Sequence, residues 1–227
     1  MENNKIHVEV KGAPLIKFQS LDKIEKLQKG LVYAKTLEYY RQREIDTGDT
    51  EVGDSFEGKI HVNEAYIHIV DGDTIALKDE LINTKHSDDY VFCMFGIYHF
   101  MNEFQFTDKQ KDKMRSFGSH ALLITDSDEF IRRVKLAAKG KYEVYFDAVN
   151  YYPPNEDSGN MLLSLVGNMW KVAFWKRDMY KYQQEARFLF VSNEHNVDHI
   201  ELDIGDISDI SIIVTAEQVL SGEVNKQ

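Results

Sequence analysis

The chain has 227 residues, 43% of them hydrophobic, and a formal net charge of −11. This length favours a single domain over residues 1–227 with one substantial core, and the acidic balance argues against long-range capture of nucleic acid by the whole surface. No run approaches the roughly 18 apolar residues that a membrane-spanning helix needs, and residues 1–5 lack an apolar signal segment. We therefore expect a cytoplasmic protein with no membrane partner.

The first part of the chain alternates between strand and helix patterns. Residues 15–20 alternate as a short strand, and Ser20 then caps a helix whose apolar spacing continues until Gly30. A second strand begins at residue 31, includes Tyr33 and leads into a more helical or turn-like segment at 37–41. Residues 47–58 are dense in glycine and aspartate, so we predict a loop there.

From residue 59 onward the pattern is rich in strands. The predicted strands are 59–61, 64–70, 74–77, 90–98, 121–125, 143–151, 183–191, 200–204 and 207–214, the predicted helices are 107–117 and 126–140, and 153–159 is a predicted exposed loop. Because no regular β-α-β alternation is present, we predict an α+β fold of two packed, mainly antiparallel sheets with flanking helices. No glycine-rich phosphate-binding motif of the Rossmann or P-loop kind occurs.

The strand predicted at 183–191 sorts its residues onto two faces. Gln183, Glu185 and Arg187 share one side, whereas the residues between and after them are mostly apolar. A period of two presses the apolar side into a core and holds the polar side outward or into a cleft. The strand therefore presents a Gln-x-Glu pair on a rigid element.

This Gln-x-Glu spacing resembles the one that carries the catalytic glutamate of ADP-ribosyltransferases. The order of elements is also similar: a first strand with Lys17 and Ser20, a helix, a second strand with Tyr33, and Glu185 on a late strand. Residues 30–33, 40–41, 53–58 and 175–187 further resemble bacterial proteins of toxin and phage-defence contexts, where DarT-like and CmdT-like toxins modify DNA or RNA. The resemblance implies that NAD binds as a co-substrate in a cleft between two small sheets.

The resemblance also implies roles for particular residues. Cleavage of the nicotinamide bond creates an oxocarbenium-like ribose that a carboxylate stabilises, and Glu185 is the implied residue. Gln183 is expected to orient the acceptor or the ribose, and Tyr33 to stack on nicotinamide. Arg41 is expected to pair with the pyrophosphate through its planar donor fork. The remaining residues implied in NAD binding are Lys17, Ser20, Tyr40 and Asp54. The first strand lacks the Arg or His of two major classes, and Lys17 or Gln19 is the available substitute.

Two other functions fit the same residues. The first is a non-catalytic binding module, whose partner docks on the Gln183, Glu185 and Arg187 face. The second is a metal-dependent nuclease or hydrolase built on Asp54, Glu57 and Glu185, since carboxylates held by turns can converge; solvated turn residues are the commoner outcome for Asp54 and Glu57.

Partners are expected from the basic and aromatic residues that precede the Gln-x-Glu pair. Lys176, Arg177 and Lys181 form a local basic run suited to phosphate, and Tyr180 and Tyr182 are candidates for base stacking. The expected acceptor is nucleic acid or protein, and an antitoxin or chaperone is a further expected partner.

Cysteine and histidine content argues against a metal centre. Cys93 is the single cysteine, which excludes an internal disulfide and a multi-cysteine zinc site, and its apolar neighbours predict a buried side chain. His195 and His199 have a His-x3-His spacing, but their segment is typical of a turn and no third ligand is evident. We predict no bound metal.

Overall fold

The computed structural model describes residues 6–8, 10–68, 72, 74–97, 105–153, 159–192 and 197–226. Its fold is α+β, with mainly antiparallel sheets and flanking helices, which confirms the fold class predicted from the sequence. Among the described residues, no helix is long and apolar enough to cross a membrane.

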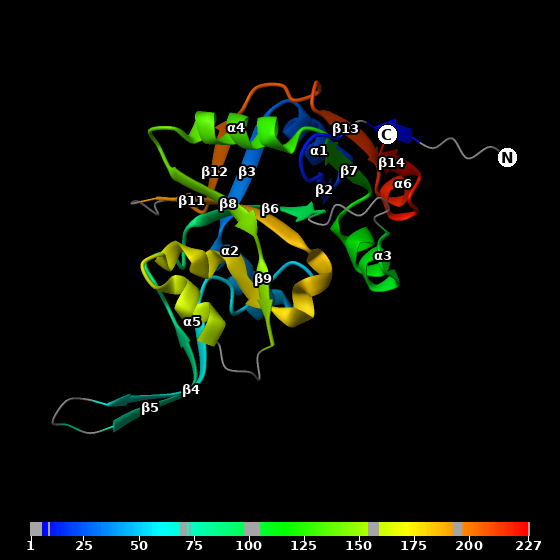
Figure 1. Cartoon of the computed structure of the whole chain (residues 1–227). Helices are drawn as coiled ribbons and strands as arrows, with labels where there is room; N and C mark the ends of the chain where they lie inside the picture. The colour runs from blue at the N-terminus through cyan, green and yellow to red at the C-terminus, as the bar shows by residue number, and fades with distance from the viewer. Residues whose placement is uncertain are drawn as a thin grey trace.

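One large sheet of eight strands forms the centre of the fold (Figure 1). The strand order is β12-β3-β6-β2-β7-β13, while β11 pairs with β6 and with β8. Its members are β2 (Leu15–Gln19), β3 (Leu31–Thr36), β6 (Tyr90–Gly96), β7 (His120–Ile124), β8 (Glu143–Ala148), β11 (Glu185–Val191), β12 (His199–Asp203) and β13 (Ser211–Thr215). Because β6 and β11 lie inside the sheet and are buried along nearly their whole length, their sequences are mostly apolar.

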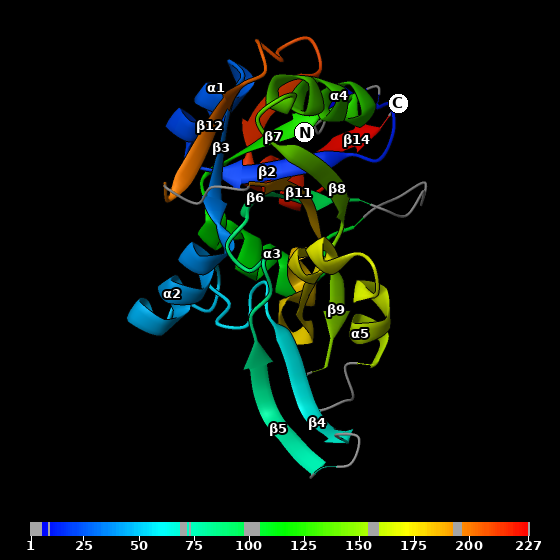
Figure 2. The same ribbon diagram turned by 90° about the vertical axis from the view of Figure 1, so that its left-hand side faces the viewer.

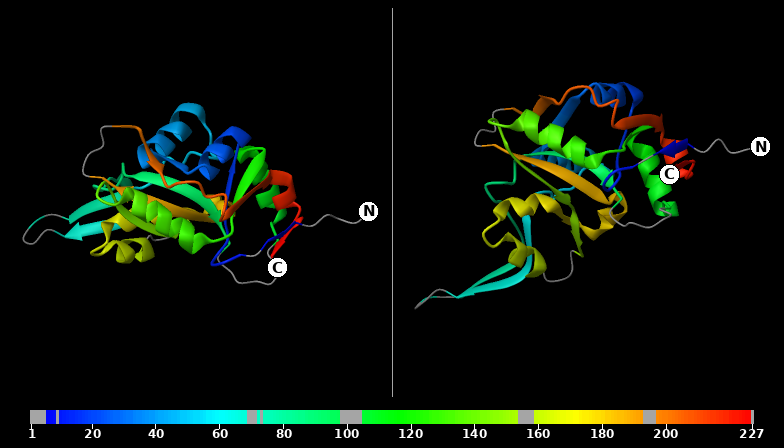
Figure 3. Two further views of the ribbon diagram at one scale, coloured as in Figure 1. Left: turned by 90° about the horizontal axis from the view of Figure 1, so that it is seen from above. Right: turned by 45° about the horizontal axis from the view of Figure 1, so that its top comes forward.

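Shorter sheets and helices surround the large sheet. The two-stranded pairs are β1 (Ile6–Val8) with β14 (Val224–Lys226), β9 (Asn150–Tyr152) with β10 (Trp175–Arg177), and β4 (Ile60–His68) with β5 (Thr74–Ile82). The helices are α1 (Leu21–Gln28), α2 (Leu37–Thr47), α3 (Asp108–Met114), α4 (Ser127–Ala138), α5 (Gly159–Leu165) and α6 (Ala216–Leu220), with 3-10 helices η1 (Arg115–Phe117), η2 (Met169–Phe174) and η3 (Asp178–Gln183). The β4–β5 hairpin projects from the body in Figures 2 and 3.

The two faces of the sheet are covered by different elements. Helices α1 and α4 pack on one face, where Ile24 and Phe130 join a core with Phe188 of β11. On the other face, Leu37 of α2 and Phe174 of η2 contribute to a second cluster. Figure 2 shows α1 and α4 on one side of the sheet and α2, α3 and α5 on the other.

The direct connection between β3 and α2 positions this helix over the middle of the sheet. Thr36 ends β3 and caps α2, since its side chain accepts a hydrogen bond from the backbone amide of Tyr39. The helix therefore follows the strand directly and carries Tyr40 over the sheet. Gly53 then lets the next loop pack on α2, because a Cβ atom at Gly53 would lie 2.6 Å from the backbone nitrogen of Glu44.

Most predicted elements are present, with some changes in their bounds. The strand predicted at 183–191 begins at Glu185, because Gln183 ends η3 and Gln184 adopts a left-handed conformation with φ 42°. The two strands predicted at 59–61 and 64–70 are one strand, β4, while the strand predicted at 143–151 divides into β8 and β9. Residues 207–210 precede β13 rather than belong to it. Parts of the predictions at 69–70, 98 and 154–158 lie outside the described residues.

Candidate functional site

The large sheet splits at the middle of β6. One edge of β6 pairs with β11 from Tyr90 to Phe95. On the opposite edge, β3 pairs with residues 90–91 and β2 pairs with residues 95–96. In the described part of the chain, neither β2 nor β3 pairs with residues 92–94, so the two strands diverge and leave an opening between them.

Lys17 supplies a partner for the backbone exposed by this split. Its Nζ donates a hydrogen bond to the carbonyl oxygen of Cys93 at 2.7 Å and lies 4.8 Å from the centroid of the Phe92 ring. An unpaired buried carbonyl is costly, which explains why a side chain reaches it. Burial lowers the pKa of the Lys17 amine. Because the amine makes no ion pair with any described residue, its positive charge lacks a directly bonded counter-ion.

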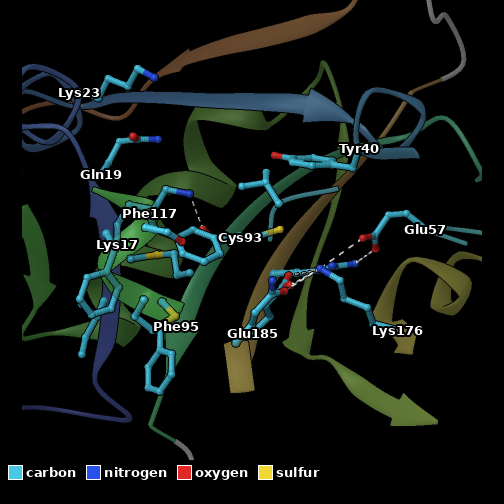
Figure 4. A pocket seen from close by; sticks show the side chains of 18 of the residues that line it. Lys17, Gln19, Lys23, Tyr40, Glu57, Cys93, Phe95, Phe117, Lys176 and Glu185 are labelled. Carbon is cyan, nitrogen blue, oxygen red and sulfur yellow. Dashed lines mark hydrogen bonds and ion pairs between the residues drawn. The ribbon is translucent and has the colours of Figure 1, made fainter. Parts of the chain in front are cut away.

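A pocket of about 320 Å³ occupies the split (Figure 4). Its walls come from β2, β6 and β11, from the helices α1, α2, α3 and η1, and from β10 and η3. The volume lies at the lower end of the range for small-molecule sites, roughly 300–1,000 Å³. The charged lining side chains are five cations (Lys17, Lys23, Arg43, Lys176 and Arg187) and two carboxylates (Glu57 and Glu185). The pocket is therefore locally cationic in an acidic protein.

Glu185 lies in a buried network of charges at one end of this pocket. Its Oε1 accepts a hydrogen bond from Lys176 Nζ at 2.7 Å, and its Oε2 accepts one from Arg187 Nε at 2.7 Å. Arg187 also contacts a carboxylate oxygen of Glu57, and Lys176 Nζ lies 3.5 Å from the other one. All four side chains are at most 8% exposed. Two carboxylates and two cationic side chains therefore neutralise one another's charge in the protein interior.

The network fixes the protonation states of its members. Burial alone would raise the pKa of Glu185, but Arg187 and Lys176 outweigh it and hold the pKa well below its usual range. Burial alone would likewise lower the pKa of Lys176, but Glu185 and Glu57 outweigh it and raise the pKa. Glu185 is therefore a permanent anion at neutral pH.

Gln183 reaches the same network although it is outside β11. Its Oε1 accepts a hydrogen bond from Lys176 Nζ at 2.7 Å, and its Nε2 donates to the carbonyl oxygen of Glu51 at 2.7 Å. The turn at Gln184 is held by its own side chain, which donates to the carbonyl oxygen of Gly96 at 2.6 Å. Gln183 and Glu185 therefore meet through Lys176, and not by sharing one face of a strand.

The loop between α2 and β4 contributes a second buried acid. Asp54 Oδ1 accepts a hydrogen bond from Arg177 Nε at 2.9 Å and lies 2.7 Å from Arg177 Nη2. Its Oδ2 is buried with no hydrogen-bond partner among the described residues. Arg177 also pairs with Glu44 of α2 at 2.8 Å. Burial, with the nearby Glu57, raises the pKa of Asp54 to about 6. Asp54 and Glu57 are thus buried, and the interpretation of both as solvated turn residues is wrong.

Four of the residues predicted for the site line the pocket: Glu185, Gln183, Lys17 and Tyr40. Figure 4 shows the Lys17 amine directed at the backbone of Cys93, with Tyr40 and Glu57 on the far side of the pocket. Cys93 is half-buried in the pocket wall, and burial raises the pKa of its thiol to about 12. The thiol is therefore protonated at neutral pH.

The other four predicted residues lie outside the pocket lining. The Arg41 guanidinium is buried and donates to the carbonyl oxygens of Glu57 and Ser87 at 2.8 and 2.6 Å, so it is not free for a pyrophosphate. Ser20 precedes α1 without a side-chain cap hydrogen bond. Asp54 is hydrogen-bonded to Arg177, and neither residue lines the pocket. Tyr33 is 40% exposed and stacks on His199.

The basic run before β11 is another correction. Lys176 and Arg177 bond to buried carboxylates and do not form a phosphate-binding surface, whereas Lys181 is exposed. Tyr180 and Tyr182 are at most 9% exposed, so neither offers a stacking surface. Sequence reasoning did not foresee Lys176 as the link between Glu185 and Gln183. The local signal was weak: the apolar residues Phe174 and Trp175 directly precede the basic pair.

The donor set does not favour a divalent metal. Each of the three carboxylates proposed for a metal-dependent hydrolase already faces an arginine or lysine, which supplies the charge that a metal would bring. Within the described ranges, no group of three or more histidine, cysteine, aspartate or glutamate residues could hold a metal ion, and His195 lies outside those ranges.

Comparisons with known proteins give no independent assignment. Neither a protein-family model nor a curated protein nor a solved structure matches this chain. The function is therefore argued from the pocket itself.

Proposed function

We propose that this protein is an NAD-dependent mono-ADP-ribosyltransferase with Glu185 as its catalytic carboxylate. The observation that carries the proposal is the position of Glu185, which lies as a fixed anion in a cationic pocket where the central sheet splits. The sequence resemblance implies an NAD-binding cleft between two small sheets, whereas this pocket lies where strands of one large sheet diverge. Both Gln183 and Glu185 line this pocket, which supports the proposal.

The pocket fits the charges that such a ligand would bring. NAD supplies a cationic nicotinamide leaving group and an anionic pyrophosphate. The Lys17 amine has no bonded counter-ion among the described residues, and Lys23 is an exposed cation of the same pocket. These two amines are suited to hold phosphate oxygens. The Glu185 carboxylate is suited to stabilise positive charge that develops on the ribose.

The residues around Glu185 keep it ready for this role. Lys176 donates a hydrogen bond to one of its oxygens and Arg187 donates one to the other, and a carboxylate oxygen can accept more than one hydrogen bond. Because both partners are buried and paired, the carboxylate does not have to reorganise during the reaction. Gln183 and Tyr40 complete the polar and aromatic wall beside it.

The biological part of the proposal rests on the sequence resemblance. We propose a bacterial toxin or phage-defence effector that acts in the cytoplasm on nucleic acid or protein. An antitoxin or chaperone partner belongs to the same proposal.

The test is release of nicotinamide from NAD by purified protein, compared among wild type, Glu185→Gln and the control Glu201→Gln. Glu201 is exposed on β12 and outside the pocket lining. We expect Glu185→Gln to lose at least about 100-fold in turnover, the scale for removal of a charge-stabilising group, while Glu201→Gln matches wild type.

Two further measurements separate catalysis from folding. Thermal unfolding by circular dichroism checks that Glu185→Gln folds, and calorimetric binding of ADP-ribose checks that the pocket remains intact. A folded wild-type protein that neither binds ADP-ribose nor releases nicotinamide would overturn the proposal and favour a non-catalytic binding module. Activity that survives in Glu185→Gln would overturn the assignment of this residue.

A further inference from the structure

Two lysines on one side of the pocket have no acidic partner among the described residues. Lys17 of β2 and Lys23 of α1 both line the pocket, and Figure 4 shows them away from Glu57 and Lys176. Lys17 donates one hydrogen bond, to the carbonyl oxygen of Cys93 at 2.7 Å. Within the described ranges, neither amine makes an ion pair with a carboxylate. Both amines are therefore available to a ligand in the pocket.

The surroundings of Lys17 favour its neutral form more than those of an ordinary lysine. The acceptor of its hydrogen bond is an uncharged carbonyl oxygen, and the Phe92 ring, whose centroid lies 4.8 Å away, attracts a cation without neutralising it. Burial lowers the pKa of the amine; Cys93 and Glu185 oppose this shift, while Lys23 adds to it. At a given pH, Lys17 therefore has a larger fraction of neutral amine than an exposed lysine.

Lys176 shows the opposite setting in the same pocket. Its amine lies 2.7 Å from an oxygen of Glu185 and 3.5 Å from one of Glu57. Burial alone would lower the pKa of Lys176, but the two carboxylates outweigh it and raise the pKa. Lys176 therefore stays an ammonium ion. A lysine that is desolvated, lacks a bonded carboxylate and lies near another cation is the kind that acts as a nucleophile, and Lys17 meets these conditions.

We propose that the Lys17 amine binds a small phosphorylated aldehyde covalently, as an imine, while Lys23 holds the phosphate of the same molecule. Lys23 is suited to this part because Arg43, a neighbouring cation of the pocket lining, is already bonded to Asp49 at 2.7 Å. A phosphate can accept from the Lys23 ammonium and the Gln19 amide together, since both side chains line the pocket. The inference does not rest on the proposed function, because it needs only the pocket and its amines.

Imine formation balances without an oxidant or a reductant. The lone pair of the neutral Lys17 amine attacks the carbonyl carbon, and the carbonyl oxygen becomes a hydroxyl group as the C–N bond forms. The hydroxyl group then leaves as water, which carries away both amine protons, and a C=N bond remains. A protonated imine retains one N–H, which can donate to the carbonyl oxygen of Cys93 as the amine does. The neutral amine serves this reaction, whereas the protonated amine serves the anion-binding role of the proposed function.

The test is incubation of the purified protein with pyridoxal phosphate at neutral pH, followed by reduction with borohydride. Reduction converts an imine to a stable secondary amine, and mass spectrometry of peptides locates it. We expect Lys17 to be labelled faster than Lys139, an exposed lysine that follows α4. Lys176 is an internal control, because it lines the same pocket but is paired with carboxylates, and it should stay unlabelled.

Variants separate the nucleophile from the phosphate site. Lys17→Arg keeps a positive charge but forms no imine under these conditions, so the label at this position should be lost. Wild type should require about 2- to 5-fold less pyridoxal phosphate than pyridoxal for equal labelling of Lys17, the scale for an ion pair at an exposed side chain, and Lys23→Gln should remove this preference. Lys35→Arg is the matched control and should react as wild type, because Lys35 pairs with Asp198 outside the pocket lining.

Two results would overturn the inference. If Lys17 in wild type is labelled no faster than Lys139, the pocket does not activate its amine. If pyridoxal and pyridoxal phosphate label Lys17 equally, the phosphorylated ligand class is wrong. Circular dichroism checks that the variants fold, and the comparison of Lys17 with Lys139 needs wild type alone, so it decides the question even where a variant does not fold. None of these measurements uses NAD, so failure of the proposed function would leave their outcome unchanged.

Discussion

Removing one charge from the buried network should destabilise the fold far more than removing an opposite pair. The perturbations are Glu57→Gln, Lys176→Met and the double variant. Glu57 and Lys176 side chains are 1% and 3% exposed, and their charged atoms lie 3.5 Å apart. Either single change leaves an uncompensated charge in the interior, which costs about 3–5 kcal/mol of unfolding free energy.

The double variant tests the balance directly. It retains Glu185 and Arg187, which are paired at 2.7 Å and leave no net charge. We therefore expect the double variant to cost about 0.5–3 kcal/mol less than the sum of the two single changes, the range for residues in one network. This difference is the coupling energy between the two side chains.

The assay is urea unfolding followed by tryptophan fluorescence, with comparison of midpoints and slopes. Glu129→Gln is the matched control, because Glu129 pairs with Arg132 and Arg133 on the surface. Its midpoint should stay close to that of wild type. If the single variants at Glu57 and Lys176 are as stable as this control, or if their effects simply add, the description of a buried balanced network is refuted.

Three further predictions concern single groups. Asp54→Asn should gain stability relative to wild type as pH rises from about 4 to 7, because the pKa of Asp54 is raised from 3.8 to about 6 in the fold. At about 1.4 kcal/mol per pH unit the gain approaches 3 kcal/mol. If the unfolding free energies of the two proteins from urea curves differ by the same amount at every pH, the prediction is contradicted. Lys17→Met should weaken ADP-ribose binding measured by calorimetry, and an unchanged affinity would count against the anion-binding role. Burial lowers the pKa of the Lys17 amine, so the wild-type affinity should fall at alkaline pH as the amine loses its proton. In Lys17→Arg this fall should be absent. Cys93, whose thiol pKa is raised to about 12 by burial, should react with iodoacetamide far more slowly in the native protein than in urea at pH 7.5, and equal rates by mass spectrometry would show an accessible thiol.

The sequence predicts helices and strands well where the hydrophobic pattern and the capping residues agree. The bounds of β2, α1 and β3 follow from alternation, apolar spacing and Gly30. A Cβ atom added at Gly30 would lie 2.3 Å from the carbonyl oxygen of Gly205, so this position requires glycine. The Gln-x-Glu spacing predicts that Gln183 and Glu185 lie close together, and both line the pocket. The reason for their proximity was different from the expected one, because the left-handed turn at Gln184 separates them and Lys176 joins them.

Tertiary contacts explain the residues that sequence reasoning misplaced. A basic pair such as Lys176 and Arg177 is ordinarily solvated, and only carboxylates from distant parts of the chain make its burial favourable. The split of the sheet at β6 also leaves no local signal, since it depends on where β2 and β3 end their pairing. Tyr33 follows the strand pattern, but its ring stacks on His199 of the neighbouring strand and lies outside the pocket lining.

The most direct measurement of the central claim is transfer of label from NAD with a radioactive adenylate to a cell lysate. The products are separated into RNA, DNA and protein, and wild type is compared with Glu185→Gln and Glu201→Gln. The account predicts label in the RNA, DNA or protein fraction with wild type and Glu201→Gln, and none with Glu185→Gln. Absence of label from every fraction, with folded protein and no release of nicotinamide, would contradict it.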